Sequence, residues 1–380
     1  MSVPPSHTQS KNRLEPLSEG WGLGLYEPDP PIYDPWHDAV HRGKAPHNLM
    51  LKIYDYCHQM HWLPPGALVL DPFGGSGRTG IVGSIKGHPV ALIEIEPFHA
   101  RQTMPKNIAY AKDHTSSKLW SYDPIYREGD ARDTKLPSDY VSAVITSPPY
   151  ADQIDSGSNE ATIRALGGRN GNEPSTLGTL QGYGKAPGQI GVLKVGVRSK
   201  KRESYEDAME TVYAEMYRVT RPGGILVTII KDGIKEGKLL PLNKISRKLI
   251  HKAGWKLLEI KDVEVNVPVD DGPDLFGTPA EPRIVGHRVS YFRRFHYKRD
   301  RNSLIRYEQV CFFQKPLQPN GHTVCHPVNG NAYTALKTSG DWTNLPPRSN
   351  GIADASDSAN RDEDPSPNQQ TSEVGQNMLL

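Results

Sequence analysis

The residues best suited to chemistry in this chain form the tetrapeptide Ser147-Pro148-Pro149-Tyr150. Prolines fix φ and carry no N–H group, so the pair must follow the end of a strand, here the apolar run 141–145. The Ser147 hydroxyl and the Pro148 carbonyl can then both point outward as hydrogen-bond acceptors. Two acceptors suit the two hydrogens of a planar amino group, and the Tyr150 ring can stack on the ring that carries the amine. The plain alternative is a proline turn after a strand.

A second motif, DPFGGSG at 71–77, also follows an apolar run. Glycines allow a strand-to-helix turn to approach a ligand closely, and the N–H groups at the helix start can face a carboxylate or another polar group. The Lys-Ser/Thr pair of a phosphate-binding loop is missing. Many nucleotide-binding folds share such a turn, so the loop alone predicts only a cofactor half-site. We expect the two half-sites to meet at one edge of a sheet.

Acidic residues follow three successive predicted strands: Asp71, Glu94 and Asp130. Glu94 suits the two hydroxyl donors of a ribose, and Asp130 could accept from the exocyclic amine of an adenine. A single acid at a strand end could simply cap the next helix. Three of them fit one adenosine-bearing ligand better.

The elements that must position these residues alternate along the chain. Strands are predicted at 67–71, 89–95, 126–130, 141–145, 225–230, 255–263 and 307–314. Helices are predicted at 48–60, 77–86, 97–111, 205–219 and 242–253. This alternation predicts an α/β fold, doubly wound, with a mostly parallel seven-stranded sheet covered by helices on both faces.

The predicted domain spans 41–315 and follows an irregular segment, 1–40, that is rich in Pro and Gly. Two inserted loops interrupt it, at 152–203 and 264–306. From residue 316 to residue 380 the composition is polar and rich in Pro, Asn, Ser and Asp, which predicts a disordered tail.

Composition narrows the class of protein. The chain has 380 residues, and no apolar run approaches the roughly 18 residues of a membrane span. The N-terminus lacks the apolar stretch of a secretory signal. The three cysteines, Cys57, Cys311 and Cys325, have no metal-like spacing. We therefore expect a cytoplasmic protein without a membrane span, a disulfide framework or a metal site.

Charge is unevenly distributed, although the formal net charge is only +2. Basic residues gather within 156–202 and within 291–306. Each stretch alone could be a solvated face. Two of them beside the motifs above predict a track for a polyanion, and nucleic acid is the expected partner.

The two motifs together closely resemble the amino-group class of S-adenosylmethionine-dependent DNA methyltransferases. The acids of IEIEP and GDA and the RPGG turn extend the resemblance over about 44–315. It implies a class I methyltransferase fold, S-adenosylmethionine as cofactor and double-stranded DNA as partner. It leaves open the oligomeric state, the recognition sequence and whether a cognate restriction endonuclease accompanies the enzyme in a bacterial, archaeal or phage-infected cell.

The resemblance also implies roles for individual residues. The cofactor loop matches at Asp71, Phe73, Gly75 and Gly77, the ribose acid at Glu94 and the acid near adenine at Asp130. The catalytic tetrapeptide matches at Ser147, Pro148, Pro149 and Tyr150. The segment KAPHN, which contains His47, resembles the element that closes over the methionine end.

Two departures from the family pattern stand out. The cofactor motif precedes the catalytic motif, whereas many members with this loop have the reverse order. Arg78 stands where the family frequently has threonine.

In this family, Ser at the first position of the tetrapeptide is commonest among cytosine N4 enzymes, and Asp or Asn among adenine N6 enzymes. Cytosine N4 is therefore the first choice for the target and adenine N6 the runner-up. An RNA base methyltransferase of the same fold is a further alternative, although neither end of the chain carries a recognisable RNA-binding domain.

Overall fold

The structure, a computed structural model, describes residues 21, 29–35, 37–41, 45–151, 186–196, 203–235, 238–264, 307–317, 330–339 and 342–345. All of them belong to one compact unit, Met1–Pro347. The second unit, Arg348–Leu380, contains no described residue.

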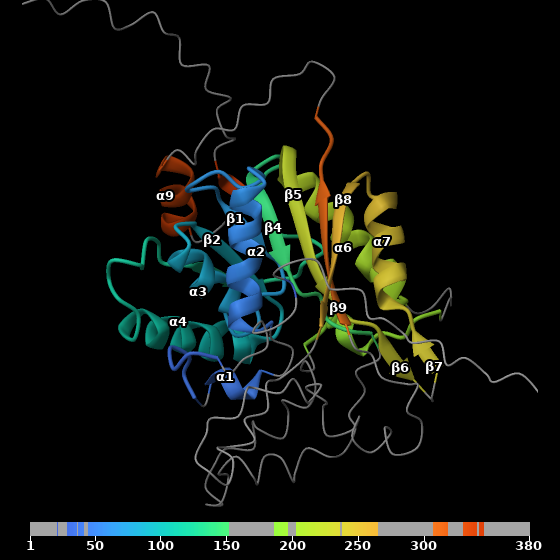
Figure 1. Cartoon of the computed structure of the whole chain (residues 1–380), viewed down its shortest axis with the longest axis horizontal. Coiled ribbons are helices and arrows are strands. Elements are labelled where there is room, and N and C mark those ends of the chain that lie inside the picture. The colour runs from blue at the N-terminus through green and yellow to red at the C-terminus, as the bar shows by residue number, and fades with distance from the viewer. Residues whose placement is uncertain are drawn as a thin grey trace, which may run out of the picture. The chain divides into compact units, whose positions relative to one another are not determined.

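A seven-stranded sheet organises the described residues, with the strand order β3-β2-β1-β4-β5-β9-β8 (Figure 1). The strands are β1 (Val69–Asp71), β2 (Val90–Glu94), β3 (Ile125–Glu128), β4 (Val141–Thr146), β5 (Thr220–Ile230), β8 (Lys256–Glu264) and β9 (Tyr307–Gln314). β9 runs antiparallel to both of its neighbours, and the other pairs are parallel. The predicted doubly wound, mostly parallel sheet is confirmed. The strand order reverses beside β1, where such sheets form a ligand crevice at the carboxyl ends of the strands.

Helices cover both faces of the sheet. They are α2 (His47–Gln59), α3 (Arg78–Ile85) and α4 (Met104–Asp113) on one face, and α6 (Tyr205–Val219) and α7 (Leu242–Lys252) on the other. A short helix, α1 (His37–Val40), precedes them, and a π-helical turn, η1 (His99–Thr103), leads into α4.

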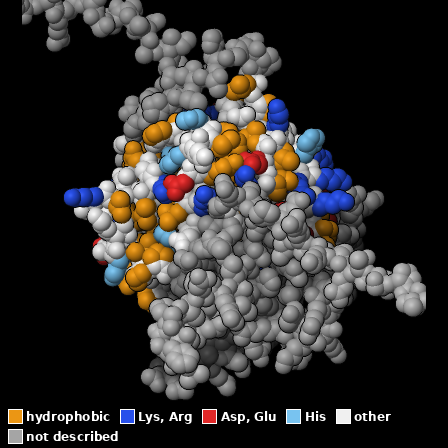
Figure 2. Space-filling model, in the orientation of Figure 1, with side chains coloured by type: hydrophobic (Ala, Val, Ile, Leu, Met, Phe, Trp, Pro, Cys, Tyr) orange, Lys and Arg blue, Asp and Glu red, His pale blue; other side chains and the backbone are white. Residues whose placement is uncertain are grey.

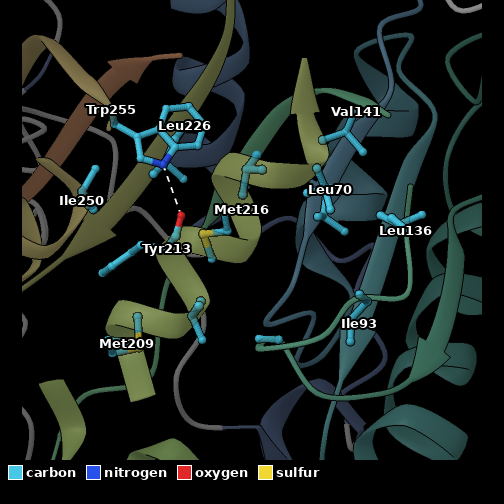
Figure 3. Close-up of a cluster of buried hydrophobic side chains, with 14 of the residues drawn as sticks. Leu70, Ile93, Leu136, Val141, Met209, Tyr213, Met216, Leu226, Ile250 and Trp255 are labelled. Atoms are coloured by element: carbon cyan, nitrogen blue, oxygen red, sulfur yellow. Dashed lines mark hydrogen bonds between the residues drawn. The ribbon is translucent and has the colours of Figure 1, made fainter. Parts of the chain in front are cut away.

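Alternation along the strands builds a separate core on each face. Leu68 and Leu70 point toward α6, whereas Ala67 and Val69 point toward α2 and α3. Figure 3 shows the α6 face, where the Trp255 indole donates a hydrogen bond to the main chain of α6. This packing fixes α6, whose first residue, Tyr205, donates a hydrogen bond to the Pro149 carbonyl of the tetrapeptide.

The N-terminus of α6 is fixed by a capping box, which is why the predicted bounds 205–219 are confirmed. The Ser204 hydroxyl accepts a hydrogen bond from the Asp207 N–H, and the Asp207 carboxylate accepts from the Ser204 N–H. Both interactions satisfy N–H groups that the first helical turn leaves without partners.

The prediction of a disordered tail from residue 316 was wrong for one segment. Residues Gly330–Thr338 form α9, and the side chains of Leu336, Trp342 and Leu345 are buried. A few apolar residues within a polar stretch are enough to dock it on the core, although the average composition hides them. The rest of the predicted tail beyond residue 317 lies outside the described residues.

The sequence also gave no sign of the hairpin of β6 (Gly233–Lys235) and β7 (Lys238–Leu240), because strands of three residues carry little periodicity. Most of the two predicted insertions, 152–203 and 264–306, lies outside the described residues. No helix of the described part of the chain is both long and apolar enough to cross a bilayer.

Candidate functional site

A cleft with about 360 Å³ of open space lies at the carboxyl ends of β1 and β4. It is lined by His41, Ala45, Met50, Asp71, Phe73, Gly74, Gly75, Ser76, Arg78, Thr79, Ser147 and Ile229. The loop after β1 and the first residue of the tetrapeptide therefore share one cleft. The two motifs thus meet at one edge of the sheet, as expected, and their roles as cofactor and substrate half-sites stay predictions.

The glycine loop is tied to the end of β2. The Gly75 N–H donates to Glu94 Oε2 at 2.8 Å, and Gly77, the N-cap of α3, has a φ of +85°. Gly75 also has a positive φ, +53°, and a Cβ on it would lie 2.8 Å from the His41 ring. Glycine is required at this position by both the backbone conformation and the close approach.

The carboxylates of Glu94 and Asp71 are buried and accept main-chain N–H groups. Glu94 also accepts from the Glu96 N–H at 2.9 Å, and burial raises the pKa of Glu94 to about 7. Asp71 Oδ1 accepts from the Phe73 N–H at 3.0 Å and from Thr146 Oγ1 at 2.6 Å. Burial likewise raises the pKa of Asp71. The bond from Thr146 joins the end of β4, which precedes the tetrapeptide, to the end of β1, which precedes the glycine loop.

Asp130, the acid predicted to lie near an adenine, is paired with Arg132. Both of its carboxylate oxygens accept from that guanidinium, at 2.6–3.0 Å. Arg132 also donates to the Gly188 carbonyl and to Glu203, both within the predicted insertion 152–203. Asp130 does not line the cleft, so its contact with a cofactor stays a prediction.

The hydroxyl of Ser147 is oriented by β5. Ser147 Oγ donates to the Ile229 carbonyl at 3.3 Å, which uses its single proton and leaves the oxygen lone pairs as acceptors. The Tyr205 hydroxyl donates to the Pro149 carbonyl at 3.0 Å, which ties the tetrapeptide to the first residue of α6. Tyr150 is half-buried against the core of the α6 face. The roles of the Pro148 carbonyl and the Tyr150 ring stay predictions.

The environment of Arg78 is the point at which the site differs most from the sequence prediction. Its side chain is only 5% exposed, although the sequence marked it as no more than a departure from the family pattern. The guanidinium donates twice to Asp38, at 2.9 and 2.6 Å, and once to Asp29, at 2.8 Å. It also donates to the Ala45 carbonyl. These partners precede Arg78 by 33 to 49 residues, so no local pattern could reveal them.

His47 does not line the cleft, although its segment does. His47 is the first residue of α2, and its Nδ1 lies 2.6 Å from the Tyr33 hydroxyl. Its N–H donates to Asp29 Oδ1. Among the described residues before α2, Ala45 of the predicted segment KAPHN and His41 reach the cleft, and no sequence pattern indicated His41.

Of the predicted basic stretches, only part lies among the described residues, within 186–196. On the face shown in Figure 2, the Lys and Arg side chains are mixed with hydrophobic, acidic and histidine side chains. Contact with a polyanion therefore stays a prediction. Within the described ranges, no group of three or more His, Cys, Asp and Glu is placed to hold a metal ion.

No protein-family model matches this chain, and no curated protein does either. Solved structures that resemble it include a TehB-like S-adenosylmethionine-dependent methyltransferase from Corynebacterium glutamicum, with 14% identity and a TM-score of 0.32 over 70% of this chain and 86% of that one. A second, from Methanosarcina mazei, has 10% identity and a TM-score of 0.35 over 69% and 98%. TrmN from Thermus thermophilus has 14% identity and a TM-score of 0.34 over 73% and 51%.

These similarities are too low to carry an argument about activity. The assignment of fold rests on the strand order itself: five parallel strands, β1 to β5, with the antiparallel β9 inserted between β5 and β8 and helices on both faces. This is the fold of class I methyltransferases.

Proposed function

We propose that this protein transfers a methyl group from S-adenosylmethionine to the exocyclic amine of a base in double-stranded DNA, with cytosine N4 as the first choice. The observation that carries the proposal is the cleft itself. The Ser147 hydroxyl, oriented as an acceptor, lines the same space as the glycine loop that follows β1.

The chemistry of the residues that line the cleft fits a polar cofactor. Ser76 lines the cleft, is 2% exposed, and its hydroxyl has no hydrogen-bond partner among the described residues. A buried hydroxyl of this kind is stabilised when a ligand supplies the missing partner. Glu94 does not line the cleft, but its carboxylate accepts the Gly75 N–H of the loop and would be the partner for a ribose diol beside it.

Ser147 would act on the substrate amine. Bound S-adenosylmethionine would supply a methyl group already activated on a sulfonium. An aromatic amine is a poor nucleophile because its lone pair is delocalised into the ring. A hydrogen bond from the amine to Ser147 Oγ favours a pyramidal nitrogen and stabilises the positive charge that develops as the C–N bond forms and the C–S bond breaks. The nitrogen then loses one proton to solvent.

The target base must leave the duplex to reach this cleft. Tyr150 follows the two prolines and is half-buried, and its ring is the candidate for stacking on a flipped base. Hydrogen bonding and stacking together would hold the amine close to the methyl group, and such placement provides a large share of the rate enhancement.

The test is to incubate the purified full chain with methyl-labelled S-adenosylmethionine and either unmodified genomic DNA or RNA, then separate the digested nucleosides by mass spectrometry. We expect label in N4-methylcytosine from DNA. Label in N6-methyladenine would select the runner-up base. Label in RNA alone would overturn DNA as the substrate, and absence of label from both would overturn the proposal.

The variant Ser147→Ala sharpens this test. Removing the acceptor should lower kcat by about 100-fold, as removal of one preorganised hydrogen bond commonly does, while cofactor affinity stays within about twofold. Ser142→Ala is the matched control: Ser142 lies on the same strand, is 1% exposed and has a hydroxyl without a partner among the described residues. Equal loss of activity in both variants would remove Ser147 from the mechanism.

A further inference from the structure

We infer that Arg78 is a positioning residue that holds the described residues between 29 and 45 as a wall of the cofactor cleft and thereby sets the affinity for the cofactor. The inference rests on the proposed function, because it takes S-adenosylmethionine as the ligand of the cleft. We call residues 29–35, 37–41 and 45 the N-terminal wall.

The contacts of Arg78 fasten both ends of this wall. Four hydrogen bonds leave the guanidinium, which has five N–H donors: two to Asp38, one to Asp29 and one to the Ala45 carbonyl. The paired carboxylates are 8% exposed in Asp38 and 22% exposed in Asp29. The guanidinium is planar and its N–H groups point in fixed directions, so a buried guanidinium fixes the direction of each hydrogen bond. The ammonium group of a lysine cannot do this. We call this set of directed hydrogen bonds the fork.

Further contacts hold the wall on either side of this fork. The guanidinium lies 4.2 Å from the centroid of the Tyr33 ring, a cation–π geometry. On the other side, Asn107 of α4 accepts from the Asp34 N–H at 2.9 Å and donates to the Ser76 carbonyl at 2.8 Å. One asparagine therefore bridges the wall and the glycine loop.

The wall reaches the ligand space directly. His41 and Ala45 line the cleft, and the His41 ring stands over Gly75. The helix within the wall, α1, has only four residues, too few to be stable without its packing partners. The position of His41 over the loop therefore depends on the attachments of the wall, of which Arg78 makes the most.

Arg78 is also the first residue of α3, directly after the glycine loop. Arg78 therefore contacts both the N-terminal wall and, through the chain itself, the glycine loop. Weakening the fork should let the wall leave the loop, so that cofactor binding has to restore the closed arrangement. The Kd for the cofactor then rises as the fraction of molecules with the wall in place over the loop falls. The reacting groups at Ser147 are unaffected.

The test uses Arg78→Lys, which keeps the charge and loses the fork. We expect the Kd and KM for S-adenosylmethionine to rise by about tenfold, the equivalent of one lost charge-assisted hydrogen bond, with kcat at saturating cofactor within about twofold. Asp29→Asn removes the negative charge of one partner of Arg78 and should raise the Kd by less than Arg78→Lys does. The double variant should bind no more weakly than Arg78→Lys alone, because both changes break one contact.

The control is Arg101→Lys, which alters an arginine that is 71% exposed and pairs with Glu128 on the surface. It should leave cofactor affinity unchanged. Hydrogen–deuterium exchange should show that the cofactor slows exchange of the wall in the wild type and slows it less in Arg78→Lys.

A lower Tm for Arg78→Lys with an unchanged Kd would make Arg78 merely structural and would overturn the inference. If Arg78→Lys fails to fold, Asp29→Asn must show the affinity loss, and an unchanged Kd there would overturn it equally. Absence of S-adenosylmethionine binding by the wild type would instead defeat the proposed function and the inference with it. Normal binding by the wild type and by both variants defeats the inference alone.

Discussion

The two halves of the cleft are held together by different kinds of hydrogen bond. In the cofactor half, main-chain N–H groups donate to carboxylates: Gly75 to Glu94 and Phe73 to Asp71. In the substrate half, side-chain hydroxyls donate to carbonyls: Ser147 to the main chain of β5, and Tyr205 to the main chain of the tetrapeptide. The first arrangement concentrates buried negative charge, and the second presents neutral oxygen acceptors.

The difference indicates how each half responds to change. Burial raises the pKa of both carboxylates, that of Glu94 to about 7, and the loop beside them needs glycine at a positive φ. The hydroxyl–carbonyl contacts carry no charge over this range. Substitutions in the cofactor half should therefore alter affinity for the cofactor, and substitutions in the substrate half should alter turnover. The Thr146–Asp71 hydrogen bond is a direct side-chain contact between β4 and β1, through which the halves can influence each other.

The largest effect is expected for Gly75→Ala. A Cβ at a φ of +53° costs about 1–2 kcal/mol, and the His41 ring would lie 2.8 Å away, so the loop must leave its binding geometry. Cofactor affinity should fall by roughly 10- to 100-fold, and calorimetric titration with S-adenosylmethionine measures the change.

Gly66→Ala provides the matched control. Gly66 has a similar φ, +69°, but lies in the turn before β1, outside the cleft, and its nearest contact would be 3.7 Å away. It should lower stability by a similar amount and leave the Kd unchanged. If both variants lose affinity equally, general strain rather than the loop geometry determines binding.

An intermediate effect is expected from the pH dependence of Glu94. Burial raises the pKa of Glu94 to about 7, so the carboxylate becomes protonated as the pH falls through 7. A protonated carboxyl is a weaker acceptor for ribose hydroxyls. The Kd for S-adenosylmethionine should therefore be about tenfold higher at pH 6 than at pH 8.

Glu94→Gln separates binding from stability. The folded-state pKa lies above the ordinary value of 4.5, so Glu94 contributes stability that is complete below about pH 4.5 and is lost as the pH rises through about 7. Glutamine cannot ionise, so this variant should melt at or above the wild-type Tm at pH 8 and bind the cofactor weakly at every pH. A Kd that still varies with pH in Glu94→Gln would point to another group.

The sequence predicted the features of the site that are local in the chain. The turn after β1 and the tetrapeptide after β4 each combine an apolar strand with residues of special backbone geometry, so a few neighbouring residues specify them. The bounds of α6 and β9 were likewise correct, because a capping box and an apolar strand mark them.

What the sequence missed depends on contacts between distant segments. Arg78 reads locally as an ordinary first residue of a helix, and only its pairing with Asp29 and Asp38 gives it a role. His41 lies in a stretch without periodicity and reaches the cleft because the wall folds over Gly75. Buried ion pairs of this kind follow from tertiary packing, which propensity and spacing do not encode.

The smallest effect should come from Tyr205→Phe in the substrate half. The buried Tyr205 hydroxyl donates to the Pro149 carbonyl, so its removal leaves that carbonyl without this donor at a cost of about 1 kcal/mol. The tetrapeptide should then sample misaligned positions, and kcat should fall by about fivefold with the Kd for the cofactor unchanged. Tyr217→Phe, about 18 Å further along the same helix, is the control and should leave both constants unaltered. A rise in the cofactor Kd for Tyr205→Phe would mean that the two halves are coupled, and the Thr146–Asp71 hydrogen bond would be the contact to substitute next.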